Sequence, residues 1–244
     1  MNNLPEISII IPAYNEEDRL PKYLNSVLEY FTQIDVSYEV LVVDDGSTDS
    51  TAVVVESFSE QNPCVKLIKL PQNRGKGYAV KTGMLQSRGR LRLFTDADGA
   101  TPIGELKRLE KAIDNKAEVA IASRALYSDT CTVNAQFHRR VIGSVFNFIV
   151  RTLVVRGVRD TQCGFKLFTA KAASSVFSLQ NIDGFGFDVE ILYTAQRKGF
   201  RISEVPVNWS DVKGAKVRLI RDSIRMFMDV IRIKINDLRG KYEY

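Results

Sequence analysis

Residues 39–50, EVLVVDDGSTDS, hold the pattern that decides the fold class of this chain. A run of β-branched residues, typical of a buried strand, is followed at once by two aspartates, a glycine and small polar residues that cap helices. The same order of apolar run, polar cluster and helical period recurs along the first half of the sequence. This alternation predicts an α/β fold built on a mostly parallel central sheet flanked by helices.

Five strands are expected in the first half, because five short runs are apolar and rich in β-branched residues. They are residues 7–12, 39–44, 65–70, 91–95 and 118–122. Segments of helical period lie between them, at residues 17–31, 49–59, 75–87 and 103–115. Thr101 and Pro102 form a favourable start for the last of these helices, with proline in its first turn.

The pattern changes after Arg124. Residues 125–136 are expected to be a polar loop, and residues 141–155 are apolar on nearly all sides. The latter segment is too short and too polar to span a bilayer, which leaves a buried helix or a helix in the membrane interface. The remaining expected elements are a strand at 161–168, a helix at 188–198, a strand at 202–206 and a helix at 217–237.

The chain shows no internal repeat and no low-complexity linker, so two units are expected: a domain at 1–216 and an appended helix at 217–244. With 244 residues and 45% apolar residues, it is neither disordered nor fibrous. Three separated cysteines make no disulfide framework and favour a reducing compartment. No signal peptide and no run of about 18–20 apolar residues is found, so we expect a soluble or peripheral protein.

The net charge of +5 is unevenly placed, because the whole basic excess lies in residues 197–244. This excess is either a solvated helix face or a contact with phosphate, nucleic acid or a membrane surface. Apolar residues recur at helical spacing among the arginines of this region: Leu219, Ile220, Ile224, Phe227, Met228, Ile231 and Ile235. Such a helix can lie on an anionic membrane, or it can dock on the protein's own core or a second subunit.

Polar clusters follow three of the predicted strands, at Pro12–Glu16, Asp44–Ser47 and Asp96–Gly99. Each cluster alone is ordinary turn or cap chemistry. The carboxyl ends of parallel strands meet at one edge of a sheet, however, where ligands bind. Carboxylates crowded at one edge repel each other unless a cation lies among them. Asp96 and Asp98 therefore predict a site for Mg²⁺ or Mn²⁺, the ions that favour oxygen ligands.

Other catalytic arrangements lack their key residues. The only histidine is His138, and the sequence has no G-x-S-x-G elbow, no Walker A loop and no strand-linked G-x-G-x-x-G. The segment Asn73–Gly77, NRGKG, is either a phosphate-binding loop before a helix or a plain loop.

Four ordered motifs carry a resemblance to a known family: IIIPAYNEE, VVDDGSTDST, NRGKGYAVKTGM and FTDADGATP. They resemble the family-2 glycosyltransferases, which have the nucleotide-sugar-binding fold called GT-A. Later segments, among them ASRAL, DTQCGFKLF, GFGFDVEIL and EVPVNWSDVKGAK, are similar to the subgroup that attaches one sugar to a polyprenyl phosphate, most closely the dolichyl-phosphate glucosyltransferases. The resemblance covers residues 7 to about 220.

The resemblance implies roles for individual residues. The positions that match the nucleotide-sugar site are Pro12, Tyr14, Asn15, Glu16, Asp44, Asp45, Lys76, Asp96, Ala97 and Asp98. Asp98, with Asp96, matches the metal-binding Asp-x-Asp element, in which Asp98 corresponds to the direct metal ligand and Asp96 to a contact with the ribose or a metal-bound water. Arg124 and Lys216 match basic positions near the diphosphate and the acceptor phosphate, so Asp98, Arg124 and Lys216 are the implied catalytic residues.

The family pattern and this sequence differ at Ala100. Mannose-transferring relatives have glutamine there, which adds a metal ligand, so alanine fits the glucosyltransferase pattern and leaves more of the metal shell to water or diphosphate. Asp188 and Glu190 are candidates for orienting an acceptor or a base, although a polar helix start explains them as well.

The implied function is inverting transfer of glucose from UDP-glucose to dolichyl or another polyprenyl phosphate. A phosphate monoester has its second pKa at about 6, so the acceptor needs no strong general base. Arg139 and Arg140, beside the apolar segment 141–155, are candidate ligands of the acceptor phosphate. The protein is expected to be peripheral on the cytoplasmic face of a membrane, and a homo-oligomer is left open.

Three alternatives remain: transfer of mannose from GDP-mannose, a different acceptor, and a nucleotide-sugar-binding membrane adaptor without turnover. A nucleic-acid partner is not expected, because the basic excess is confined to the tail and no aromatic-rich recognition motif accompanies it.

Overall fold

The structure is a computed structural model that describes residues 4–134, 154–212 and 219–243, with side chains from residue 225 onward in the last range. The segment 141–153 of the predicted apolar helix lies outside the described residues.

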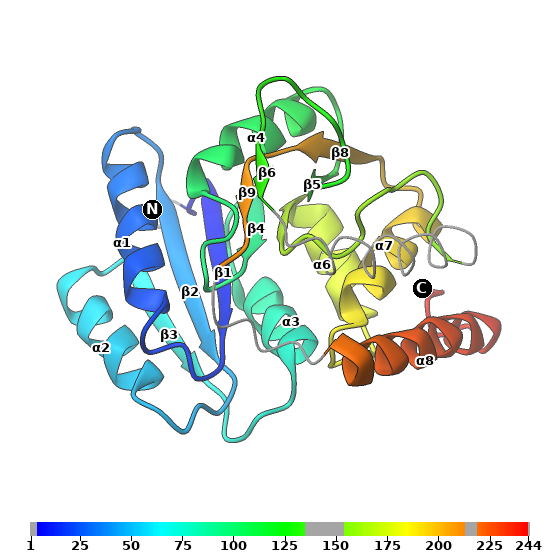
Figure 1. Ribbon diagram of the computed structural model, residues 1–244, viewed down its shortest axis with the longest axis horizontal. Helices are drawn as coiled ribbons and strands as arrows, with labels where there is room; N and C mark the ends of the chain where they lie inside the picture. The colour runs from blue at the N-terminus through cyan, green and yellow to red at the C-terminus, as the bar shows by residue number, and fades with distance from the viewer. Residues whose placement is uncertain (1–3, 135–153, 213–218, 244) are drawn as a thin grey trace.

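A seven-stranded sheet in the order β3-β2-β1-β4-β7-β5-β8 forms the centre of the molecule (Figure 1). Its strands are β1 Ile7–Ala13, β2 Tyr38–Asp44, β3 Val65–Lys69, β4 Leu91–Thr95, β5 Val119–Ser123, β7 Phe165–Thr169 and β8 Ile202–Pro206. All run parallel except β7, which is antiparallel to both of its neighbours. The predicted α/β fold with a mostly parallel sheet is confirmed.

Helices cover both faces of the sheet, as Figure 1 shows. They are α1 Leu20–Thr32, α2 Thr51–Gln61, α3 Lys76–Gln86, α4 Leu106–Asp114 after the 3-10 turn η1 Ile103–Glu105, α6 Ala170–Ser178, α7 Phe187–Arg197 and α8 Leu219–Leu238. Every residue of β1 is buried, and successive side chains enter opposite cores. Ile10 packs with α3, α6 and α7, whereas Ile9 and Ile11 pack with α1 and α4.

Several boundaries differ from the expectations. The predicted strand 161–168 begins only at Phe165, because residues 158–164 form a loop that returns to the sheet edge. The predicted helix 17–31 begins at Leu20, since the backbone N–H groups of Glu16 and Glu17 are bound by Thr51, the first residue of α2, and by Asp49 just before it.

Helix α6 was not predicted, and neither was the short sheet of β6 Val133–Asn134 and β9 Trp209–Ser210. The sequence of α6, AKAASSVFS, is rich in alanine and serine, so only Val176 and Phe177 mark its buried face with large apolar side chains. Its N-cap was a usable signal, because the Thr169 side chain accepts a hydrogen bond from the backbone N–H of Ala172 at 3.3 Å.

The last helix, α8, packs on the core through one face and exposes a second apolar face. Met226, Val230 and Ile233 are buried in the cluster beneath α6 and α7. The exposed apolar residues of the helix are Phe227, Met228, Ile231, Ile235 and Leu238. Among the described helices, none combines the length and the apolar character that a membrane crossing requires.

A buried tyrosine fixes the end of the chain after α8. The Tyr242 hydroxyl donates to Glu190 Oε1 at 2.7 Å, and its ring lies against Tyr193 of α7. Glu190 also accepts the backbone N–H groups of Asn181 and Ile182. Glu190 therefore ties α7 to the preceding loop and to the end of the chain.

Candidate active site

Three strand ends bring their polar clusters to one edge of the sheet. Strand β1 lies between β2 and β4, with Ala13 beside Asp44 and Ile10 beside Phe94. The loops after β1 and β2 are joined by side chains: Asn15 N–H donates to Ser47 Oγ at 2.9 Å, and Thr48 N–H donates to Asn15 Oδ1 at 2.8 Å. The first two clusters therefore form one connected surface rather than two separate turns.

The predicted nucleotide residues after β1 face different environments. Pro12 is buried at the end of the strand, and Tyr14 is 37% exposed at the edge. Glu16 forms a hydrogen-bonded ion pair with Arg19, at 2.8 Å to Nε and 2.5 Å to Nη2. Asn15 has a φ of 53°, a left-handed conformation that asparagine tolerates better than most residues. The chain is thus turned sharply where the polar cluster begins.

The two aspartates after β2 have different partners. Asp45 accepts the backbone N–H groups of Arg74 and Gly75, each at 2.8 Å, so it holds the loop that leads into α3. Burial raises the pKa of Asp45, although these two hydrogen bonds oppose the shift. Asp44 accepts from Ser47 N–H through Oδ1, while its buried Oδ2 finds no hydrogen-bond partner within the described part of the chain. Asp44 thus keeps unmet acceptor capacity.

Lys76, the first residue of α3, contacts the end of β4. Its Nζ lies 2.5 Å from Asp96 Oδ1, and the lysine and aspartate side chains are 21% and 35% exposed. Burial would lower the pKa of Lys76, but the charges of Asp96 and Asp188 outweigh it and raise that pKa. The sequence suggested a phosphate-binding role for this loop without indicating a partner for its lysine.

The Asp-x-Asp element follows β4 in a tight turn. Asp98 Oδ1 accepts the backbone N–H of Ala100 at 3.0 Å, and Ala97 between the aspartates is buried. Burial raises the pKa of Asp98, and the nearby charge of Asp96 adds to this effect. In the described residues, no group of three His, Cys, Asp or Glu side chains is placed to hold a metal ion. The two carboxylates nevertheless fit a hard cation whose remaining ligands are water or substrate oxygens.

The loop before β7 approaches Asp96 closely. The backbone N–H of Asp96 donates to Gly164 O at 3.0 Å. A Cβ atom at Gly164 would lie 2.1 Å from Asp96 Oδ2, so only glycine leaves room for this carboxylate. The antiparallel course of β7 brings this loop to the edge where β4 ends.

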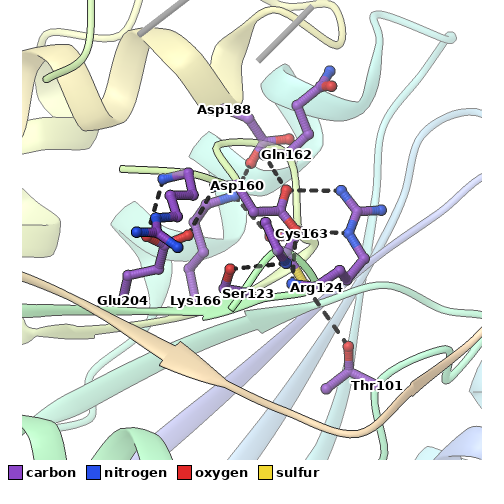
Figure 2. Close-up of polar contacts among 11 residues, drawn as sticks. Thr101, Ser123, Arg124, Asp160, Gln162, Cys163, Lys166, Asp188 and Glu204 are labelled. Carbon is purple, nitrogen blue, oxygen red and sulfur yellow. Dashed lines mark hydrogen bonds and ion pairs between the residues drawn. The ribbon is translucent and has the colours of Figure 1, made fainter. Parts of the chain in front are cut away.

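Arg124, directly after β5, is held by a buried carboxylate (Figure 2). Its Nε and Nη2 donate to Asp160 at 2.7 and 2.8 Å, and its backbone N–H donates to Asp160 at 2.9 Å. Burial alone would raise the pKa of Asp160, but the Arg124 guanidinium outweighs it and lowers that pKa. Asp160 N–H in turn donates to Glu204 of β8 at 2.8 Å. The arginine is therefore fixed in position at the same edge of the sheet.

A second buried ion pair joins β7 to α7. Lys166 Nζ contacts Asp188 Oδ1 and donates to Cys163 O at 2.7 Å, and the lysine side chain is fully buried (Figure 2). Burial raises the pKa of Asp188, with Lys166 opposing the shift. Sequence reasoning missed both Asp160 and Lys166. A lysine within the buried strand sequence FKLFT was the available signal, because such a charge needs a partner.

Three of the predicted residues lie outside the described part of the chain: Arg139, Arg140 and Lys216. Their roles stay predictions. The structure does bring Asp44, Asp45, Lys76, Asp96 and Asp98 to one edge, as the motifs suggested. Asp188 and Glu190 are instead buried in contacts that support α7.

A model described as Glycosyl transferase family 2 matches residues 8–177 of the chain. The chain belongs to glycosyl transferase family 2. It is similar to a Dictyostelium discoideum protein named dolichyl-phosphate beta-glucosyltransferase, with 42% identity over 246 residues that cover 96% of this chain and 75% of the relative. A human protein of the same name is 38% identical over 250 residues, covering 97% of this chain and 77% of the relative. The predicted glycosyltransferase family is confirmed.

Two solved structures share the fold of this chain. A glucosyl-3-phosphoglycerate synthase from Mycobacterium tuberculosis, crystallised with Mn²⁺, uridine diphosphate and glucosyl-3-phosphoglycerate, has a TM-score of 0.69 at 20% identity, covering 95% of this chain and 79% of that one. A mannosyl-3-phosphoglycerate synthase from Rubrobacter xylanophilus has a TM-score of 0.71 at 16% identity, covering 98% and 76%. The predicted GT-A fold is confirmed.

Proposed function

We propose that this family-2 glycosyltransferase moves glucose from UDP-glucose to dolichyl or another polyprenyl phosphate, with inversion at the anomeric carbon. The observation that carries the proposal is the meeting of Asp96, Asp98 and Lys76 beside the Asp44–Asp45 loop at one sheet edge. The names of relatives that match at least 93% of the chain support glucose and dolichyl phosphate.

Asp96 and Asp98 would hold a divalent ion, Mg²⁺ or Mn²⁺. Such an ion supplies Lewis-acid stabilisation of the charge that develops on a leaving diphosphate. Two protein carboxylates leave most of the ion's coordination to water and to the donor. That division is typical of Mg²⁺, which is commonly held by one or two carboxylates plus substrate phosphates.

The loops after β1 and β2 would receive the nucleotide. Tyr14 offers an exposed ring there, and the Asn15–Ser47 hydrogen bond keeps the two loops together. Asp44 Oδ2, a buried acceptor, fits the N–H of a base such as uracil. Asp45 acts indirectly in this proposal, because its two backbone hydrogen bonds fix the start of α3 and so the position of Lys76.

Cations rather than a general base would govern acceptor binding. The acceptor phosphate and the donor diphosphate are both anionic, so they must be held together against their repulsion. Arg124 is oriented by Asp160 through Nε and Nη2, and we assign its Nη1 side to an anionic substrate group. Lys216, Arg139 and Arg140 remain the proposed further ligands of the acceptor phosphate.

The exposed face of α8 is proposed to lie on an anionic membrane, on its cytoplasmic side. The helix meets the protein through Met226, Val230 and Ile233, which leaves its outer apolar residues, including Phe227 and Ile231, in contact with solvent. Exposed basic residues border this outer face at Arg225, Arg232 and Arg239, while Lys234 Nζ lies 4.9 Å from the ring centroid of Tyr193 in α7. An apolar stripe bordered by cations matches a bilayer with anionic headgroups.

A donor and acceptor panel tests the activity. We expect a labelled lipid product from UDP-glucose and dolichyl phosphate, dependent on Mg²⁺ or Mn²⁺, and a β-linked sugar by NMR of the product. GDP-mannose and water-soluble acceptors should give much less product. A preference for GDP-mannose, or an α-linked product, would overturn the proposal, and no turnover with any pair would favour the adaptor alternative.

Flotation with liposomes tests the membrane contact separately. The protein should float with vesicles containing phosphatidylserine more than with phosphatidylcholine alone. Replacing Ile231 and Ile235 with serine should abolish flotation, while Arg232→Gln should weaken it about fivefold, since one basic residue contributes ~1 kcal/mol near such a surface. Val53→Ser, at an exposed apolar residue of α2, is the matched control. Equal flotation of all variants would remove α8 from the membrane contact.

A further inference from the structure

Lys76 forms an ion pair with Asp96, one of the two carboxylates assigned to the metal. Its Nζ lies 2.5 Å from Asp96 Oδ1, a direct ion pair, and Asp98 is two residues further along the same turn. A divalent ion bound by Asp96 and Asp98 must therefore share Asp96 with an ammonium group of the protein. Two positive charges around one carboxylate repel each other more strongly in a partly buried site than in water.

The backbone of Lys76 is fixed, so only its side chain can move. Asp45 holds the N–H groups of the two preceding residues. On the other side, a Cβ atom at Gly77 would lie 2.6 Å from Ile182 O, which shows how closely α3 packs on the loop before α7. A lysine on a fixed backbone can still turn its flexible four-carbon stem between neighbouring anions.

The charges around Lys76 are unequal. Three carboxylates, Asp96, Asp98 and Asp188, act on this lysine. Asp188 already has Lys166 as a buried partner. Arg19 and Arg124 also act on Asp98 and Asp96, but they are paired with Glu16 and Asp160. Two lysines thus face the remaining three carboxylates, and the excess negative charge attracts a further cation to the edge at Asp96 and Asp98. That cation would, however, repel Lys76 from its present partner.

We propose that Lys76 and the divalent ion compete for Asp96, and that a nucleoside diphosphate ends this competition by giving the Lys76 ammonium phosphate oxygens to bind. The inference rests on the metal site of the proposed function. In this arrangement the ion is held weakly by the protein alone and tightly together with the diphosphate. The two ligands then bind cooperatively, and each tightens the other by the same factor.

Direct measurement of Mn²⁺ binding tests the inference. Free Mn²⁺ is followed by electron paramagnetic resonance in titrations of wild type and variants, with and without UDP, at constant ionic strength. Lys76→Met should bind Mn²⁺ alone about tenfold more tightly than wild type, and the factor by which UDP tightens Mn²⁺ should fall about tenfold, a coupling within the usual range. Lys76→Arg keeps the charge and should behave as wild type.

Lys171→Met is the matched control, because Lys171 is exposed on α6 and the substitution changes net charge equally. It should leave both Mn²⁺ affinities unchanged. Circular dichroism checks the fold of each variant, and Lys76→Gln replaces Lys76→Met if the latter does not fold. Equal Mn²⁺ affinity in wild type and the uncharged variant overturns the competition, and so does an unchanged effect of UDP. Absence of Mn²⁺ binding by wild type with UDP would instead contradict the metal site of the proposed function.

Discussion

The carboxylates of this protein have different surroundings at the donor edge, after β1, β2 and β4, and on the side formed by β7 and α7. On the β7–α7 side, Asp160 receives a two-pronged hydrogen bond from Arg124, and Glu190 receives two backbone N–H groups and a tyrosine hydroxyl. At the donor edge, Asp98 accepts one backbone N–H, and Asp96 is paired with a lysine that can turn away. Carboxylates with a full set of hydrogen-bond and ion-pair partners stabilise the fold. Carboxylates with few such partners are available to bind a ligand.

The pKa shifts of Asp160 and Asp98 follow the same division. Burial opposes ionisation of both, but Arg124 lowers the pKa of Asp160 while Asp96 further raises that of Asp98. Removing a partner on the β7–α7 side should therefore lower the stability of the fold. Removing a carboxylate at the donor edge should instead stop the reaction.

The largest expected effect is on stability, from Lys166→Met. The substitution leaves Asp188 buried without its principal cation, and breaking a buried pair in this way costs about 3–5 kcal/mol of unfolding free energy. Urea denaturation measures the loss. The double variant Lys166→Met with Asp188→Leu should lose less, because no charge is left unpaired. An equal or larger loss in the double variant would show that packing, and not the ion pair, is decisive.

Asp98→Ala should have the next largest effect, on activity alone. We expect kcat/KM for glucosyl transfer to fall about 10²–10³-fold, the usual range for losing one electrostatic group in a reaction. The urea midpoint should stay close to that of wild type. Asp114→Asn, at an exposed aspartate of α4, is the control and should keep full activity. A large drop in stability without a drop in turnover would reverse the division made here.

The structure explains why the sequence predicted the carboxylates of the donor edge but not the ion pairs of the β7–α7 side. Asp44, Asp45, Asp96 and Asp98 each follow a strand within a few residues, so a local pattern and the rule of parallel strand ends sufficed to bring them together. The partners on the β7–α7 side are separated by long stretches of chain. Arg124 and Asp160 are 36 residues apart, and no periodic pattern connects them.

The sequence also did not predict the direction of β7 or the buried face of α8. Nothing in the apolar run of β7 indicates that it lies antiparallel between β4 and β5, because a buried strand reads alike in both directions. In α8, four of the predicted apolar residues lie on the exposed face, Phe227, Met228, Ile231 and Ile235, and the core contacts Met226, Val230 and Ile233 were not singled out. When a helix has two apolar faces, its sequence does not indicate which face packs on the core.

Asp160→Asn should lower stability by about 1.5–3 kcal/mol at neutral pH, since it removes hydrogen bonds to a charged group. The pKa of Asp160 is lowered in the folded protein, so its contribution is complete above the ordinary aspartate pKa and is lost as pH falls through the lowered value. The difference between wild type and variant should therefore shrink in strong acid. Urea midpoints across the pH range measure this, and a constant difference would contradict it.

The smallest expected effect comes from Gly164→Ala, which should cost about 1 kcal/mol, the low end for an overpacked substitution, because its Cβ atom meets only the movable end of the Asp96 side chain. Its Cβ atom would collide with the Asp96 carboxylate, so weaker Mn²⁺ binding in the presence of UDP should accompany the stability loss. Gly104→Ala is the control, because a Cβ atom there meets nothing within 4 Å. A destabilised Gly164→Ala protein with unchanged Mn²⁺ binding would show that Asp96 is displaced without consequence for the site.

The ion pair between Arg124 and Asp160 also affects which changes in chain length the fold can accommodate. Arg124 directly follows β5, and Asp160 lies before β7, where the chain re-enters the sheet. Their ion pair therefore joins the two ends of the segment between these strands. The entropy of closing a loop grows only slowly with its length. Insertions or deletions within this segment can therefore accumulate while its two ends keep their positions beside the sheet. The loops after β1, β2 and β4 lie outside this segment, so such changes leave the donor edge unaltered.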